Sequence, residues 1–190
     1  SGNPEADSTI VADDSPFSAI NEQIKSDPSN PELYMDRASL HAEALDFSAA
    51  IYDVNRAISI DSSAADYYAV KASYMIDDKK EGDARYALMK ALELDPDNIK
   101  AHLLFSEMYL WLDDFEKAIA SADKVLKQDV HNARGYYLKG LAFKYLGDTS
   151  KAVSSFQTSI EQNPDFFEGY LQLGLLYAIA RHPLALDYYN

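Results

Sequence analysis

The sequence predicts an all-α fold in which helix–turn–helix units stack into an α-α superhelix. Residues 133–166 carry two amphipathic stripes, one around Gly140 and one around Ala152, separated by a polar turn at residues 147–149. The same pattern returns when the window is shifted by 34 residues in either direction. Seven glycines and seven prolines are few for 190 residues, as expected of an all-helical chain. One such unit cannot bury its own apolar face, so we expect neighbouring units to stack.

The 34-residue period is carried by small residues at fixed positions. The small residue near the middle of each first helix is Ala38, Ala72, Ser106, Gly140 and Gly174. The small residue opening each second helix is Ala50, Ala84, Ala118 and Ala152. The second helices stop at Ser62, Pro96, Val130 and Pro164. Small side chains at these places would let two helix axes approach within roughly 8–10 Å.

These positions resemble the tetratricopeptide repeat (TPR), a 34-residue helix–turn–helix unit, over roughly residues 30–190. The resemblance implies a right-handed superhelix with the first helices on its concave wall. The chain departs from the family pattern at the place before the first small residue, where leucine is usual; here it holds Arg37, Lys71, Phe105, Lys139 and Leu173. The third repeat also has His102 and Ala122 where bulky aromatic residues are common, and Val130 in place of proline.

In chain order, we interpret residues 1–15 as a disordered acidic leader and residues 16–30 as a capping helix. Four full repeats follow at residues 31–64, 65–98, 99–132 and 133–166, and a partial fifth at residues 167–190. The predicted helix pairs are 32–44 with 47–60, 64–77 with 81–94, 99–112 with 115–128, and 133–146 with 149–162.

The fifth repeat has a normal first helix, but its second helix begins near Leu184 and has room for only a turn or two. A helix of that length is not stable alone. The chain is either cut from a longer array, which we favour, or completed by another chain. In both cases we expect self-association through this open C-terminal repeat edge.

Composition excludes several classes of function. The net charge of −14 argues against nucleic acid and against adsorption on anionic membranes. The chain has no cysteine, which rules out disulfides and thiolate metal sites. Its most apolar run, residues 171–180, is too short to span a bilayer, so we predict no direct membrane insertion.

No catalytic constellation is recognisable, and we predict that the chain is not an enzyme and holds no cofactor. The histidines occur at unrelated phases of the repeat, and none shows the spacing of a zinc helix. The acidic pairs at residues 13–14, 77–78 and 113–114 fall in the leader and in inter-helix turns, where solvated charge is the default. No glycine-rich phosphate loop or nucleophile elbow occurs.

The resemblance places the binding surface on the concave wall, at the second, fifth, ninth, twelfth and thirteenth positions of each first helix. The C-terminal half of this wall is apolar and aromatic with a few cations, which suits a peptide-binding hot spot. The candidate partner-binding residues are Lys100, Leu103, Glu107, Leu110, Trp111, Arg134, Tyr137, Leu141, Lys144 and Tyr145. The alternative is that these rings pack on each other inside the superhelix. The residues of a carboxylate clamp are absent, because only one basic residue matches in either possible register.

We therefore predict a non-catalytic protein–protein interaction scaffold that binds a partner peptide or helix in its groove. The alternatives are a structural assembly subunit acting through stack edges and convex face, and the regulatory part of a longer protein. The acidic leader would suit a tether to a lipid-anchored N-terminus, which favours the cell envelope over the cytoplasm, and would equally suit a linker. The missing initiator methionine leads us to expect that upstream residues have been removed.

Overall fold

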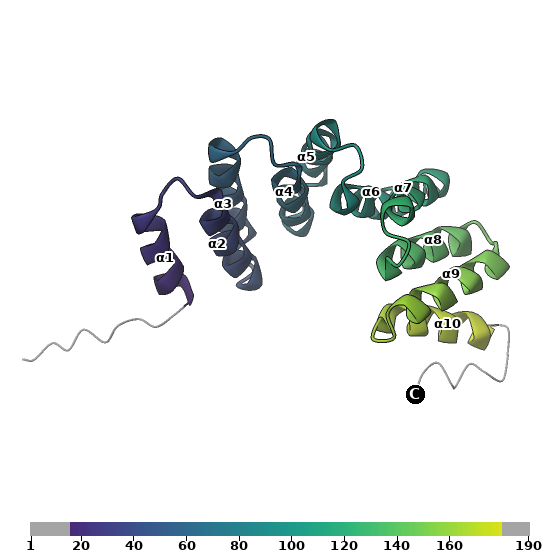
Figure 1. The fold of residues 1–190 in the computed structure, drawn as a ribbon. Coiled ribbons are helices and arrows are strands. Elements are labelled where there is room, and N and C mark those ends of the chain that lie inside the picture. Colours follow the sequence, from purple (N-terminus) through teal and green to yellow (C-terminus); the bar gives the residue numbers. More distant parts are fainter. Residues whose placement is uncertain (1–15, 180–190) are drawn as a thin grey trace, which may run out of the picture. The chain divides into compact units, whose positions relative to one another are not determined.

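The computed structural model describes residues 16–179, which form ten α-helices and, within that range, no strand (Figure 1). The predicted all-α class is confirmed. The predicted leader at residues 1–15 and the second helix of the fifth repeat, beginning near Leu184, lie outside the described residues.

The helices follow the predicted pairs to within two residues at each end. Their bounds are α1 Pro16–Ser26, α2 Pro31–Glu43, α3 Phe47–Ile60, α4 Ala65–Asp77, α5 Glu81–Leu94, α6 Ile99–Trp111, α7 Phe115–Gln128, α8 Ala133–Tyr145, α9 Thr149–Gln162 and α10 Phe167–Ile179. The even-numbered helices from α2 to α10 are the first helices of the repeats, and α3, α5, α7 and α9 are the second helices.

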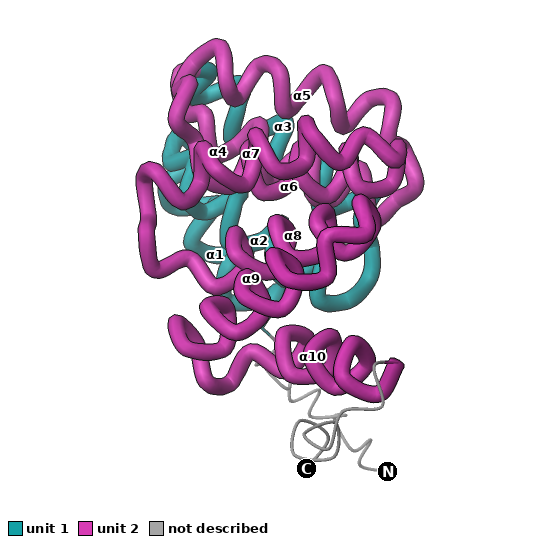
Figure 2. The backbone as a smooth tube through the Cα atoms, turned by 90° about the vertical axis from the view of Figure 1, so that its right-hand side faces the viewer, with its two compact units in different colours: residues 1–62 teal, residues 63–190 magenta. Residues whose placement is uncertain are grey.

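The chain divides into two compact units, residues 1–62 (unit 1) and residues 63–190 (unit 2), which Figure 2 colours separately. Unit 1 contains α1 to α3, and unit 2 contains α4 to α10. The repeat boundaries and the capping role of α1 stay interpretations of the sequence.

Unit 1 is joined by a buried ion pair that explains one departure from the family pattern. Arg37 on α2 stands where leucine is usual, and its Nε and Nη2 donate hydrogen bonds to the two carboxylate oxygens of Asp53 on α3, at 2.7 and 2.6 Å. Its Nη1 donates to Asn21 Oδ1 on α1 at 2.7 Å. The hydrogen bond to Asp53, which is only 1% exposed, raises the pKa of Arg37. One planar guanidinium therefore joins all three helices.

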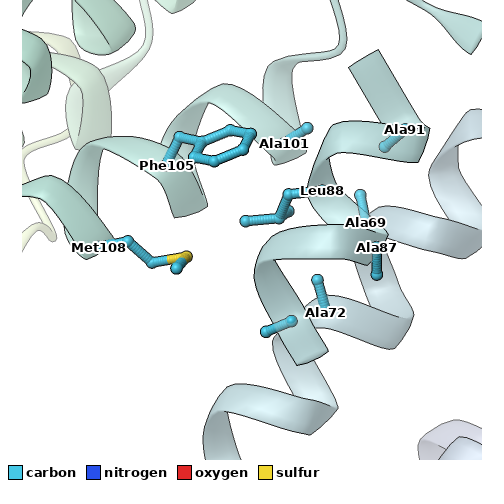
Figure 3. Packing of buried hydrophobic residues seen from close by; sticks show 9 residues of the cluster. Ala69, Ala72, Ala87, Leu88, Ala91, Ala101, Phe105 and Met108 are labelled. Carbon is cyan, nitrogen blue, oxygen red and sulfur yellow. The ribbon is translucent and has the colours of Figure 1, made fainter. Parts of the chain in front are cut away.

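The core of unit 2 is built on small residues where paired helices touch. Ala72 on α4, Ala84 on α5 and Ala118 on α7 are fully buried. Figure 3 shows one cluster, in which Leu88 of α5 lies among alanines of α4 and α5 and projects toward Phe105 of α6. Each alanine leaves room for a larger side chain from the neighbouring helix, which fills the space at ordinary packing density.

Helices α8 and α9 approach each other closely at Gly140 on α8. A Cβ atom placed there would lie 2.6 Å from Phe156 Cε1 on α9, and Phe156 is itself fully buried. The ring therefore packs directly on the α8 backbone, and glycine is required by space at this position rather than by backbone conformation.

In residues 16–179, the four turns that join the first and second helices of a repeat share one backbone geometry. The residue at the same place in each turn has a positive φ: Leu45 (59°), Lys79 (59°), Asp113 (56°) and Gly147 (80°). The next residue donates its N–H to a carbonyl five residues earlier at 2.7–2.9 Å, which closes the first helix. In three turns that next residue is an aspartate whose side chain also caps the second helix: Asp46, Asp114 and Asp148. In these three turns the aspartate therefore ends the first helix through its backbone N–H and caps the second helix through its side chain.

We predict that Gly140→Ala lowers the free energy of unfolding by about 1–2 kcal/mol. The gain in helix propensity, about 0.5–1 kcal/mol, is outweighed by overpacking against Phe156. Urea denaturation followed by circular dichroism measures the change.

The matched control is Gly82→Ala on α5, where an added Cβ meets no atom within 4 Å. This variant should be as stable as the wild type or slightly more stable. Equal stability of Gly140→Ala and Gly82→Ala would refute the close contact between α8 and α9.

Candidate functional site

The first helices α4, α6 and α8 of unit 2 form one continuous wall. Helix α4 packs against α6, and α6 packs against α8. Among the described helices, the second helices α5, α7 and α9 do not pack against one another to a comparable extent. Since the first helices approach each other more closely, they lie on the inner, concave side of this part of the stack.

A pocket of about 280 Å³ opens in this wall, where three first helices meet. Its lining is mainly apolar, with Lys100 and Arg134 as its two charged residues. The lining residues are Ala69, Val70, Ser73 and Tyr74 of α4, Lys100, Leu103 and Leu104 of α6, and Arg134 of α8. An apolar pocket with a few polar groups is typical of a site that accepts one side chain of a ligand.

Both basic residues of the pocket are paired with carboxylates of the preceding first helix. Lys100 Nζ lies 3.6 Å from Asp66 Oδ2. The guanidinium of Arg134 donates from Nε to Glu107 Oε1 at 2.8 Å, and also from Nη2 to the same oxygen. These partly exposed pairs contribute at most about 1 kcal/mol each. They set the positions of the two cations beside the pocket.

Tyr137 of α8 packs into the unit rather than out of it. Its ring lies 5.8 Å from that of Phe156 and 5.3 Å from that of Phe166, between ring centroids. Burial raises the pKa of the Tyr137 hydroxyl above its ordinary value, and the nearby Glu168 carboxylate acts in the same direction. A hydrogen bond with Gln172 partly opposes that rise.

An exposed row of large apolar side chains follows the C-terminal ends of α6, α8 and α10. Trp111, Tyr145 and Ile179 stand 34 residues apart and are 59%, 57% and 77% exposed. Tyr145 also stacks on Phe115 at 5.4 Å between ring centroids. The same position holds the carboxylates Glu43 and Asp77 in the first two repeats. The row is therefore confined to the last three repeats.

The structure divides the ten sequence-predicted residues into four groups. Lys100, Leu103 and Arg134 line the pocket, and Glu107 holds Arg134. The aliphatic residues among the ten pack with Tyr137 in one cluster: Leu103, Leu110 and Leu141. Lys144 donates to Gln172 Oε1 at 2.8 Å and lies over the ring of Tyr145. Trp111 and Tyr145 are the most exposed apolar members.

Three residues of the pocket, Val70, Tyr74 and Leu104, were not among the wall positions given by the resemblance. Val70 and Leu104 are the sixth residues of their helices, and Tyr74 is the tenth residue of α4. Each directly follows a wall position along the chain, at Ala69, Leu103 and Ser73. A large apolar or aromatic residue next to a wall position is the signal that could have identified them.

Residues 16–179 contain no cluster of three or more His, Cys, Asp or Glu residues able to hold a metal ion. Over the same range, every helix is too short or too polar to cross a bilayer.

Two overlapping segments of the chain match models of a known protein family. Residues 75–142 and residues 133–166 match family models described as tetratricopeptide repeat. A 78-residue segment, 41% of the chain, is 37% identical to RNA polymerase II-associated protein 3 of Rattus norvegicus. The match spans only 12% of the length of that relative.

Solved structures share the fold at low sequence identity. The structure of pilF from Pseudomonas aeruginosa has a TM-score of 0.77 at 19% identity, covering 86% of this chain and 74% of that one. YrrB, described as a TPR protein with an unusual peptide-binding site, has a TM-score of 0.63 at 19% identity, covering 90% of this chain and 88% of that one. At these identities the likeness concerns the fold alone.

Proposed function

Because the chain belongs to the tetratricopeptide-repeat family, we propose that it is a non-catalytic scaffold that binds a segment of a partner protein on the wall formed by α4, α6, α8 and α10. Proteins of this family generally act as scaffolds rather than catalysts. One similar structure, YrrB, is described as having a peptide-binding site. The partner segment is an extended peptide or a short helix.

The pocket at Val70, Tyr74 and Leu104 is the observation that carries this proposal. Its volume, about 280 Å³, is enough for one bulky apolar side chain of the partner. Lys100 and Arg134 lie at the same pocket, so backbone carbonyls or a carboxylate of the partner can accept hydrogen bonds from them. Their existing ion pairs with Asp66 and Glu107 hold both cations in position before the partner arrives.

The exposed row of Trp111, Tyr145 and Ile179 provides a second contact area. Large aromatic side chains that are exposed without a ligand contribute most when a partner buries them. Tyr137 is not expected to be part of that area, because its ring already packs on Phe156 and Phe166.

We predict that Ser73→Phe abolishes partner binding while the fold is retained. Ser73 lies half-buried in the pocket lining, and a phenyl ring there would occupy the space meant for the partner. A pull-down from the source cells compares this variant with the wild type and with Trp111→Ala/Tyr145→Ala. All proteins are first checked by circular dichroism.

The matched control is Ser150→Phe, which adds the same ring to an exposed site on α9. A partner held by the wild type and by Ser150→Phe, but lost by Ser73→Phe, supports the pocket. A partner held equally by every variant would place binding elsewhere and contradict the proposal.

A second candidate function is assembly through the edge of the stack. Helix α10 exposes four large apolar residues, Phe167 (70%), Leu171 (37%), Leu175 (38%) and Ile179 (77%). Residues spaced by four lie on neighbouring turns of one helix face, so these side chains form a stripe. Exposed apolar stripes of this kind are typical of protein interfaces.

For this second candidate we expect concentration-dependent dimerisation of the full chain in sedimentation velocity. Leu171→Glu/Ile179→Glu should weaken the dimer at least tenfold, because each variant residue would bring a charge into an apolar contact. Leu112→Glu, at another exposed leucine (67%), is the control. A wild-type chain that stays monomeric at all concentrations would exclude assembly through α10.

A further inference from the structure

The outer face of unit 2 carries a second groove, on the side of α6 away from the concave wall. Two adjoining pockets of about 420 Å³ and 240 Å³ share His102, Tyr109 and Ser121. The floor is formed by His102, Phe105 and Tyr109, which recur along one face of α6. Helices α5 and α7 form the two sides. We call this feature the α5–α7 groove.

Two residues of α6 at this groove differ from their counterparts in the neighbouring repeats. His102 stands where Tyr68, Tyr136 and Tyr170 occur in the repeats on either side. Ala101 precedes it, at the position where α8 has Gly135 and α10 has Gly169. The backbone at Gly135 lies so close to α7 that an added Cβ would be 3.0 Å from Leu126 Cδ2. Since Ala101 already carries a Cβ, the α6 backbone cannot approach α5 in the same way.

His102 is held in place as part of the floor. Its Nε2 lies 2.9 Å from the carbonyl oxygen of Pro96. In the first repeat, the hydroxyl of Tyr34 donates to the carbonyl oxygen of Pro28 at 3.0 Å. Tyr34 and Pro28 occupy the positions equivalent to His102 and Pro96, 68 residues earlier. The fold therefore accepts either ring at this position, and the imidazole leaves more space above the floor.

The two sides of the groove differ in chemistry. The α5 side presents Met89, which is 53% exposed, together with Leu92. The α7 side presents Lys117 and Lys124 on either side of the small residues Ala120 and Ser121. These four recur at the spacing of one helix face, so the two ammonium groups are about two turns apart.

The groove is positively charged in an acidic protein. Its charged lining residues are two cations, Lys117 and Lys124, and one carboxylate, Glu93, so the lining has a net charge of +1 against −14 for the chain. Lys117 donates to Asp114 Oδ2 at 2.5 Å and lies over the ring of Tyr109, 5.5 Å from its centroid. That hydrogen bond raises the pKa of Lys117, while the positive charge of Arg85 on α5 acts to lower it. Arg85 therefore adds to the local positive potential.

The same chemistry continues at the corresponding positions of the preceding repeat. A pocket of about 340 Å³ is lined by Tyr68, Lys71, Tyr86 and Lys90, with Asp83 as its single carboxylate. Tyr86 is 74% exposed. Lysines next to exposed aromatic rings thus recur along the outer face of α4 and α5.

From this geometry we propose that the α5–α7 groove is a second protein-binding site, separate from the concave wall, for an acidic segment that carries a bulky apolar residue. The apolar residue lies on Phe105 and Tyr109 beside Met89. Carboxylates on either side of it pair with Lys117 and Lys124. A basic segment would be repelled by these cations, so the outer face selects by charge.

The test uses a phage-displayed library of random twelve-residue peptides enriched in Asp and Glu, selected on the full chain. The selected peptides are labelled with fluorescein, and their affinities are measured by fluorescence anisotropy. The variants are His102→Tyr, which fills the groove with the ring used in the adjacent repeats, and Lys117→Glu/Lys124→Glu, which reverses its charge. Ser73→Phe, on the concave wall, is the control.

We expect the selected peptides to combine acidic residues with one large apolar residue. Their affinity should fall at least tenfold in His102→Tyr and in Lys117→Glu/Lys124→Glu, and stay unchanged in Ser73→Phe. His102→Tyr should keep the wild-type melting temperature. If His102→Tyr is destabilised, the peptide affinity of Lys117→Glu/Lys124→Glu tests the groove independently. The proposal is overturned if no acidic peptide is enriched, or if the peptides bind both groove variants as tightly as the wild type. Peptides lost only in Ser73→Phe would overturn it while supporting the concave pocket.

Discussion

The contact between small residues of paired helices is the constraint on which the rest of this structure depends. Where α8 meets α9, the Phe156 ring lies directly against the backbone of Gly140, and Ala152 is fully buried beside it. Where α4 meets α5, Ala72 and Ala84 have the same role around Leu88. A larger residue at any of these places would separate the helices and change the angle at which the next pair stacks. Recurrence of the small residues every 34 positions therefore gives every pair a similar geometry.

This repeated geometry gives unit 2 two different faces. On the inner face the first helices pack against each other, and the remaining space is a pocket between α4, α6 and α8 with Lys100 and Arg134 beside it. On the outer face the second helices are farther apart, and the space between α5 and α7 is a groove lined by His102, Phe105 and Tyr109. Ion pairs between one first helix and the next, such as Arg134 on α8 with Glu107 on α6, join the repeats on the inner face. One repeat pattern can therefore serve two ligands of different chemistry.

The sequence predicted the helices well because the information is local. Small residues, aspartate caps and helix stops recur with the repeat, and each acts within one helix pair. The sequence predicted which positions of each first helix face the concave wall, but it did not predict which residues those side chains contact. Tyr137 was expected on the wall, yet its ring packs on Phe156 and Phe166, because contacts across repeats depend on how far neighbouring helices are apart. Arg37 was treated as a departure from the family pattern, and its partner Asp53 could be found only in three dimensions.

The central claim is that a partner protein binds the inner wall of unit 2 at the pocket between α4 and α6. Site-specific photo-crosslinking in the source cells tests it most directly, with a benzophenone amino acid placed at Ser73 in the pocket or at Ser154 on the exposed surface of α9. The account predicts a defined crosslinked product from position 73 that is absent from position 154, and that disappears when Trp111 and Tyr145 are both replaced by alanine. Identical crosslinking from the two positions, or none from position 73, would contradict it.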